Sequence, residues 1–259
     1  MNSRLDNIKD PEEKAFLKQF INYSQKIKQT YRSYYTDFYN KQWMSELIRR
    51  YIGTLDEEYC RFFGGYENAE RQLLGFFPSK DYPFEFPVGC IKIIVKTGIG
   101  KPLTHRDFLG ALMGLGIKRD MIGDIIVTNF GAYIILHNNV MDYVLWNLNG
   151  IGRYQNIEVN EIPFDQIEYK EENIKEVYAS VSSLRADSVL ASGFGLSRTT
   201  CAKLIQNDRA RCNGLSISNS TLLKEGDYAT IKGYGKIKLH EVMGTSKKGK
   251  LRICIHKYI

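Results

Sequence analysis

The sequence predicts an α+β fold in three parts, and three observations lead to that prediction. Apolar and aromatic side chains recur at helical spacing within residues 1–75. Strand-like and helix-like segments alternate through residues 76–165. Residues 180–259 hold 14 Lys+Arg against 5 Asp+Glu, whereas the whole chain has a net charge of +7. Such a concentration of positive charge is typical of a surface that binds nucleic acid.

The first part, residues 1–75, is predicted to be a helical region. Pro11 suits the first position of a helix, and Phe16, Leu17 and Phe20 follow at helical spacing. A second helix is expected over residues 41–51. The tyrosines between the two helices either stack on bases or pack between helices. They are Tyr31, Tyr34, Tyr35 and Tyr39.

The second part, residues 76–165, is predicted to be a ferredoxin-like, RRM-like domain. A β-rich run at residues 88–95 precedes a helix that Thr104 can cap. A hairpin over residues 122–136, a helix over 138–148 and a strand near 154–162 complete the order β-α-β-β-α-β. Many RNA-recognition domains share this order, but their aromatic stacking signature is not evident in these strands.

An acidic connection over residues 164–179 is expected to lead into the third part, residues 180–259. There we expect a helix over 183–191, a second helix capped by Ser197 and several short strands. The last of these alternates basic and apolar residues, which places Lys236 and Lys238 on one face of the strand.

Four separated motifs in the third part carry a family resemblance. They are Leu184-Arg185-x-Asp187-x-Val189-Leu190, Leu196-Ser197-Arg198-x-x-Cys201-x-x-Leu204-Ile205, Asn213-Gly214 and Gly226-Asp227. The stretch resembles the S-four RNA-binding domain, named after the small-subunit ribosomal protein. The family commonly has leucine, glycine and valines where this chain has Ala186, Asp208, Ala210 and Cys212. These departures bear on the packing of the first strand more than on RNA binding.

The resemblance implies that two helices meet folded RNA and that basic side chains contact phosphates. Carried over by position, the best contact candidates are Arg185, Ser197, Arg198 and Lys203. Further candidates extend the patch, and they are Arg209, Arg211, Asn213, Lys232, Lys236 and Lys238. We expect all of these side chains to converge on one surface.

Two segments outside the third part narrow the family. One runs from Phe62-Phe-Gly-Gly-Tyr to Arg71, and the other runs from Leu103-Thr-His-Arg-Asp to Ile122-Gly-Asp-Ile125. Both are similar to the YlmH family of bacterial proteins. This similarity implies a non-enzymatic RNA-binding protein that associates with rRNA of the large ribosomal subunit and with tRNA. It further implies a role in ribosome-associated quality control, in which the protein holds peptidyl-tRNA on a stalled, split subunit. The cysteines, odd in number and widely spaced, separately favour reduced thiols in a cytoplasmic protein.

Both segments also have local structural interpretations. The glycines Gly64 and Gly65 predict a capped turn that opens a short helix before Arg71. In the other segment, His105, Arg106 and Asp107 form either the polar first turn of a helix or a secondary RNA contact through His105 and Arg106.

No catalytic residue, metal site or cofactor is predicted. The 5 cysteines form no CxxC pair, and the 4 histidines lack the spacing of zinc ligands. No apolar run reaches the roughly 18 residues of a membrane helix. One alternative is an RNA-modifying enzyme of the pseudouridine synthase type. Arg4-Leu5-Asp6 superficially resembles the motif that contains the nucleophilic aspartate of such enzymes. Another alternative is an adaptor whose front part binds an unidentified protein while the basic part binds RNA.

Overall fold

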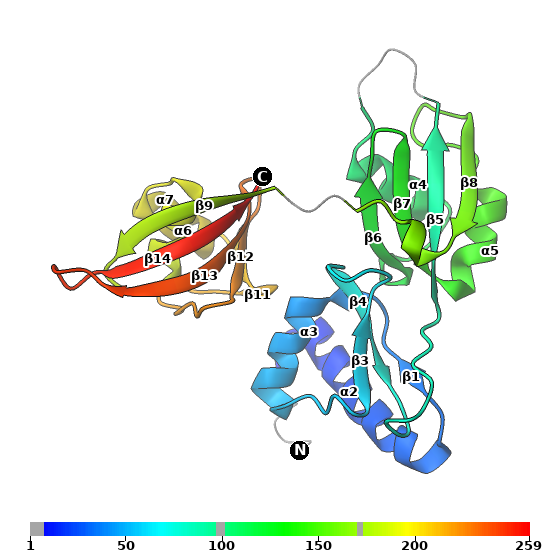
Figure 1. Ribbon diagram of the computed structural model, residues 1–259, viewed down its shortest axis with the longest axis horizontal. Coiled ribbons are helices and arrows are strands. Elements are labelled where there is room, and N and C mark those ends of the chain that lie inside the picture. The colour runs from blue at the N-terminus through cyan, green and yellow to red at the C-terminus, as the bar shows by residue number, and fades with distance from the viewer. Residues whose placement is uncertain (1–7, 97–101, 170–172) are drawn as a thin grey trace. The chain divides into compact units, whose positions relative to one another are not determined.

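A computed structural model describes residues 8–96, 102–169 and 173–259, in which the fold is α+β. The chain divides into two compact units, Met1–Tyr169 and Lys170–Ile259 (Figure 1). The Arg4-Leu5-Asp6 triplet and residues 170–172 of the expected acidic connection lie outside the described residues. Within the described ranges, every helix is too short or too polar to cross a membrane.

The first unit begins with the predicted long helix, α2 (Pro11–Thr30). Asp10 caps it by accepting hydrogen bonds from the backbone N–H groups of Glu12 and Glu13. Its apolar stripe is buried, and the Phe16 ring packs against Trp43 of α3 (Lys41–Leu47). A π-helical turn, η1 (Ile48–Ile52), extends α3 through the end of the second predicted helix.

A small sheet, which the sequence did not predict, also belongs to this region. Strands β1 (Tyr34–Tyr35), β2 (Tyr39–Asn40) and β3 (Cys60–Phe63) all pair antiparallel with β4 (Arg71–Phe76). The short helix expected after Gly65 is absent from the described residues, because the chain turns there from β3 into β4. Pairing on both sides of β4 satisfies its backbone while its side chains are buried, so tertiary packing overrides the local turn signal.

The predicted β-α-β-β-α-β order occurs in the second half of this unit. Its elements are β5 (Val88–Val95), α4 (His105–Gly114), β6 (Ile122–Val127), β7 (Gly131–His137), α5 (Asn138–Asn147) and β8 (Ile157–Ile162). The strands lie in the order β6-β7-β5-β8 with every neighbour antiparallel. Gly131 opens β7 at a φ of 151°, and a Cβ there would lie 2.1 Å from the Ile93 carbonyl oxygen. Short 3₁₀ turns, η2 (Arg119–Met121) and η3 (Phe164–Gln166), flank the sheet strands in sequence.

Both faces of this four-stranded sheet are covered. Helices α4 and α5 bury one face, where Phe108 and Val144 pack against Ile93 (Figure 1). The opposite face packs against the N-terminal region through Phe38 and Leu73. RNA-recognition domains stack bases on the sheet face that lacks helices. Here that face is part of the protein core.

The second unit is a six-stranded antiparallel sheet with two helices. Its elements are β9 (Ile174–Val181), α6 (Ala186–Phe194), α7 (Arg198–Gln206), β10 (Ala210–Cys212), β11 (Leu215–Ser216), β12 (Tyr228–Ile231), β13 (Gly235–Thr245) and β14 (Leu251–Tyr258). The strand order is β11-β10-β12-β13-β14-β9. Helices α6 and α7 lie on one side of the sheet (Figure 1). Gly193 lets α6 approach closely, since a Cβ there would lie 2.7 Å from the Ile237 side chain.

One expectation about the linker is wrong. Residues 174–179, the end of the acidic connection expected over 164–179, form most of β9, which pairs along the full length of β14. Alternation explains this outcome, because Val177, Ala179 and Val181 face the core while Glu176, Tyr178 and Ser180 face outward. The many acidic residues of the expected connection favoured a linker, although residues 176–181 alternate between apolar and polar side chains as a strand does.

Candidate nucleic-acid interface

Two of the predicted contact residues, Arg185 and Arg198, meet on a buried carboxylate. Arg185 precedes α6 and Arg198 begins α7, so the two come from different helices of the helix pair. The Arg198 guanidinium lies 2.7 Å from one oxygen of Asp187, and Nε of Arg185 lies 3.2 Å from the other. The arginine side chains are 41% and 53% exposed, whereas that of Asp187 is 10% exposed. The carboxylate thus orients two cations that still face solvent.

The charge state of Asp187 follows from this geometry. Burial alone would raise the pKa of its carboxyl, but hydrogen bonds from Arg198 and Arg185 outweigh burial and lower that pKa below 3.8. Asp187 is therefore ionised at neutral pH. Sequence reasoning treated it only as a motif residue, although its spacing from Arg185 was the available signal of an ion pair.

Ser197 and Lys203 lie on the same helix pair. Ser197 caps α7, because its Oγ accepts a hydrogen bond of 3.0 Å from the Thr200 backbone N–H. Lys203 is exposed on α7, while Cys201 and Leu204 face the core. Together with the arginine pair, these residues define what we call the helix face: Arg185, Ser197, Arg198 and Lys203.

Three other candidates are engaged within the fold. Arg209 donates to the Lys232 carbonyl at 3.0 Å, and Arg211 pairs with Asp208 at 2.7 Å. The Asn213 amide donates to Asp227 at 2.8 Å, and its oxygen accepts from the Tyr228 N–H at 2.9 Å. Asn213 therefore has a defined structural role in its turn.

Lys236 and Lys238 occupy the opposite side of the sheet from the helices. Ile237 and Leu239 alternate with them in β13 and are fully buried in the core beneath α6 and α7. Each lysine lies over an aromatic ring, with Lys236 Nζ 4.2 Å from the Tyr258 centroid and Lys238 Nζ 5.2 Å from that of Tyr228. We call this side of the sheet, opposite α6 and α7, the open face.

The predicted cations therefore do not converge on one surface. The helix face holds Arg185, Arg198 and Lys203, whereas Arg211, Lys236 and Lys238 project from the open face. Strand alternation is the reason, because residues flanked by buried neighbours must point away from the helices.

The departures from the S-four pattern are accommodated. Asp208 adopts the left-handed conformation with a φ of 54°, at the position where the family commonly has glycine. Its pairing with Arg211 holds this turn in place. Ala210 and Cys212 are both buried in the core of the second unit. The first strand after α7 thus packs with smaller side chains.

In the first unit, His105, Arg106 and Asp107 form the first turn of α4. Asp107 accepts a hydrogen bond of 2.7 Å from the Thr104 backbone N–H, as in a capping box, and a second of 2.7 Å from the Thr104 hydroxyl. His105 and Arg106 are exposed. Although the ring has exposed area, its partial desolvation and the nearby Arg119 lower the pKa of the His105 imidazole, which favours its neutral form. RNA contact by His105 and Arg106 stays a prediction.

The two YlmH-like segments come together at Asp124 of β6. This carboxylate accepts hydrogen bonds from the Tyr66 hydroxyl at 2.8 Å and from the backbone N–H groups of Glu70 and Arg71 at 2.7 and 3.0 Å. The Arg71 side chain donates in turn to the carbonyls of Phe38, Ile122 and Arg119. These motif residues fasten the turn before β4 to the four-stranded sheet.

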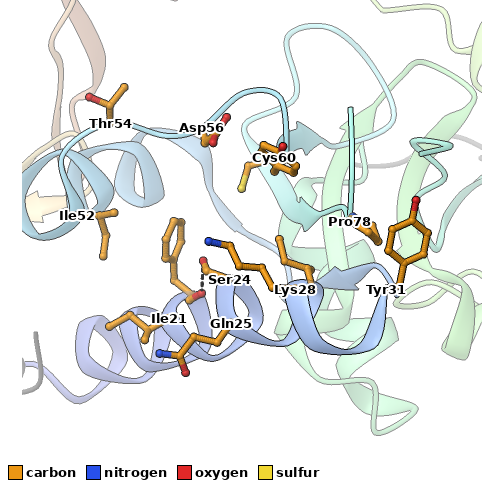
Figure 2. A pocket seen from close by; sticks show the side chains of 13 residues that line it. Ile21, Ser24, Gln25, Lys28, Tyr31, Ile52, Thr54, Asp56, Cys60 and Pro78 are labelled. Carbon is orange, nitrogen blue, oxygen red and sulfur yellow. Dashed lines mark hydrogen bonds between the residues drawn. The ribbon is translucent and has the colours of Figure 1, made fainter. Parts of the chain in front are cut away.

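A pocket of about 710 Å³ lies between α2 and residues 52–60. Figure 2 shows Ser24 and Lys28 of α2 facing Asp56 and Cys60. The lining is mainly apolar, and none of the predicted contact residues belongs to it. The tyrosines that precede α3 mostly pack internally, as when Tyr39 stacks on Trp43 at 5.2 Å.

The sequence did not lead us to single out two exposed aromatic residues of α5. Tyr143 and Trp146 lie one turn apart on the outer side of α5 and are 50% and 83% exposed. An amphipathic helix that carries aromatic residues on its polar side was the available signal.

Comparisons with known proteins show what the chain is similar to. Residues 89–166 match the family model described as "Putative RNA-binding domain in YlmH". Ribosome-associated protein quality control protein P2 of Bacillus subtilis (strain 168) is 28% identical over 251 residues, which cover 95% of each chain. The solved structure of cell division protein YlmH from Streptococcus pneumoniae has a TM-score of 0.50 at 21% identity. It covers 62% of this chain and 98% of its own, and its likeness concerns the fold.

Proposed function

We propose that the chain is an RNA-binding protein that acts on the ribosome, and its similarity to YlmH-type proteins supports this proposal. The finer proposal is that it contacts rRNA of the large subunit together with tRNA and serves quality control of stalled peptidyl-tRNA. In this proposal the protein holds RNA and catalyses no reaction. We assign residues 76–165 to the ferredoxin-like class and the second unit to the S-four class.

The observation that carries the proposal is the arginine pair on Asp187. A buried carboxylate holds two guanidinium groups at the surface between α6 and α7, which restricts their conformations before any ligand arrives. Guanidinium groups match the geometry of phosphate oxygens and can donate two hydrogen bonds to one phosphate. Lys203 adds a third exposed cation on α7.

Binding by the helix face is tested with the double variant Arg198→Gln, Lys203→Glu. Glutamine is used at position 198 because a carboxylate there would face Asp187 and disturb the fold. We expect at least about a tenfold loss of affinity for purified large subunits in a pelleting assay. The matched control is Lys9→Glu, Lys18→Gln, which changes the charge equally at exposed positions of the first unit and should bind normally.

The open face is tested separately with Lys236→Gln, Lys238→Glu. Equal losses in the two double variants would assign RNA binding to both faces of the second unit. Unchanged binding by a correctly folded helix-face variant would contradict the proposal that Arg198 and Lys203 contact RNA. Far-ultraviolet circular dichroism and thermal unfolding establish the fold of each variant.

A further inference from the structure

A cluster of three side chains that could bind a metal ion lies on the open face, where β9 pairs with β14. Glu176 of β9 is the register partner of His256, and Cys254 stands two residues earlier on β14. Since side chains two apart on a strand share a face, Cys254 and His256 project to the same side. One ligand atom from each of the three side chains lies within 4.8 Å of the others.

The orientation of these side chains favours a common ligand. Nε2 of His256 is buried without a hydrogen-bond partner and lies 3.7 Å from Oε1 of Glu176. The other carboxylate oxygen, Oε2, accepts a hydrogen bond of 2.6 Å from the Tyr178 hydroxyl. This bond holds the carboxylate so that its second oxygen is directed toward His256. Hydrogen bonds of this kind orient the ligands of metal sites.

The His256 ring is also held in place. It stacks on His240 with ring centroids 3.9 Å apart and an interplanar angle of 16°. Cys254 is 3% exposed, so its thiol is shielded from solvent. Two of the three groups are therefore positioned by the fold, and Glu176 is oriented by its neighbour Tyr178.

We propose that Glu176, Cys254 and His256 form a zinc site that fastens β9 to β14. A sulfur, a nitrogen and a carboxylate oxygen are the ligand types that Zn²⁺ takes, whereas Mg²⁺ and Ca²⁺ require oxygen ligands. Zinc bonds of about 2.0–2.3 Å would bring the ligand atoms to roughly 3.3–3.6 Å from one another. Nε2 of His256 and Oε1 of Glu176 are already 3.7 Å apart, and side-chain rotation must bring any pair at the 4.8 Å limit closer by about an ångström. Three protein ligands leave a fourth position for water.

The site has a structural consequence. Strand β9 is at the edge of the sheet, and it is the first element of the second unit. A metal that bridges β9 and β14 would stabilise the folded state by its binding free energy. The thiol of Cys254 must lose its proton on binding, so Zn²⁺ uptake should release a proton.

The test uses the full chain, freed of metal by chelation and titrated with ZnCl₂ and CoCl₂. We expect one equivalent of metal, proton release, a higher thermal midpoint with Zn²⁺, and a near-ultraviolet thiolate-to-cobalt absorption band. Cys254→Ala should abolish the band, while Cys201→Ala, which removes another buried thiol of the same unit, should retain it. Tyr178→Phe should weaken binding by about tenfold, because it removes the hydrogen bond to Glu176.

Two exposed positions keep the test decisive if the Cys254 variant does not fold. Glu176→Gln and Tyr178→Phe alter solvent-facing side chains, and both should lower zinc affinity without loss of fold. Absence of the cobalt band in the wild-type chain would overturn the proposal. So would a band that Cys201→Ala and Cys254→Ala reduce alike. RNA binding by the helix face is independent of either result.

Discussion

At the scale of single residues, Asp187 is central to the candidate interface. It is ionised, nearly buried, and bound by arginines from two helices. An isolated buried charge is costly, and here the two guanidinium groups compensate that cost. Asp187 therefore has a double role, because it stabilises the junction of α6 and α7 and also positions the groups proposed to meet RNA.

Asp187→Asn should destabilise the protein by about 1–2 kcal/mol at pH 7, because charge-assisted hydrogen bonds become neutral and the arginines are partly screened by solvent. The folded-state pKa of Asp187 lies below its usual value of 3.8, so its contribution is complete above that pH and is lost as the pH falls through the folded-state pKa. The difference between wild type and variant should therefore shrink in acid. Urea unfolding at pH 7 and below pH 3.8 measures it.

Asp142→Asn is the control for this prediction, because Asp142 is exposed on α5. It should change stability by less than about 0.5 kcal/mol at either pH. A deficit of Asp187→Asn that is equally large in acid would show that the carboxylate charge is not what stabilises the junction.

At the scale of elements, the YlmH-like motifs join segments that are distant in the sequence. Asp124 on β6 binds the turn that leads into β4, and Arg71 at the start of β4 binds carbonyls around β6. Burial raises the pKa of the Asp124 carboxyl, and the hydrogen bonds from Tyr66, Glu70 and Arg71 counteract that rise. The motif residues thus have a structural explanation that requires no ligand.

Asp124→Ala should destabilise the first unit by about 3 kcal/mol or more, because three donors lose their acceptor at a largely buried site. Tyr66→Phe removes one of these donors and should cost only about 1 kcal/mol. Denaturant titration followed by tryptophan fluorescence measures both, because Trp43 and Trp146 both lie in this unit. Equal effects of the two variants would contradict a shared role of the three hydrogen bonds.

At the scale of the whole molecule, the net positive charge is concentrated in the second unit. That concentration predicts RNA binding that depends strongly on salt, because each neutralised phosphate releases counterions. If about four or five phosphates are contacted, a fourfold rise in salt should lower the affinity by roughly two decades. Fluorescence anisotropy with labelled rRNA fragments across a salt series gives the slope. A slope close to zero would argue against phosphate contacts.

Much of the fold could be predicted from local pattern. The helix after Asp10, the strand at residues 88–95, the capped helix after Thr104 and the helix capped by Ser197 all occur where the sequence predicted them. Each depends on signals within a few residues, namely a cap, a periodicity or a terminating glycine. The small sheet around β4 and the strand β9 were missed, because their stability comes from partners distant in sequence.

The sequence by itself determined that this is an α+β protein with a basic C-terminal part and YlmH-like motifs. Composition and motif spacing are properties of the linear sequence, so they can be determined without a structure. Tertiary structure alone decided which cations share a face, that Asp187 pairs with two of them, and that Glu176 meets Cys254 and His256. The physical reason is strand alternation combined with pairing between distant segments. Successive residues of a strand place their side chains on opposite faces of the sheet, and the register between strands determines which side chains lie next to each other.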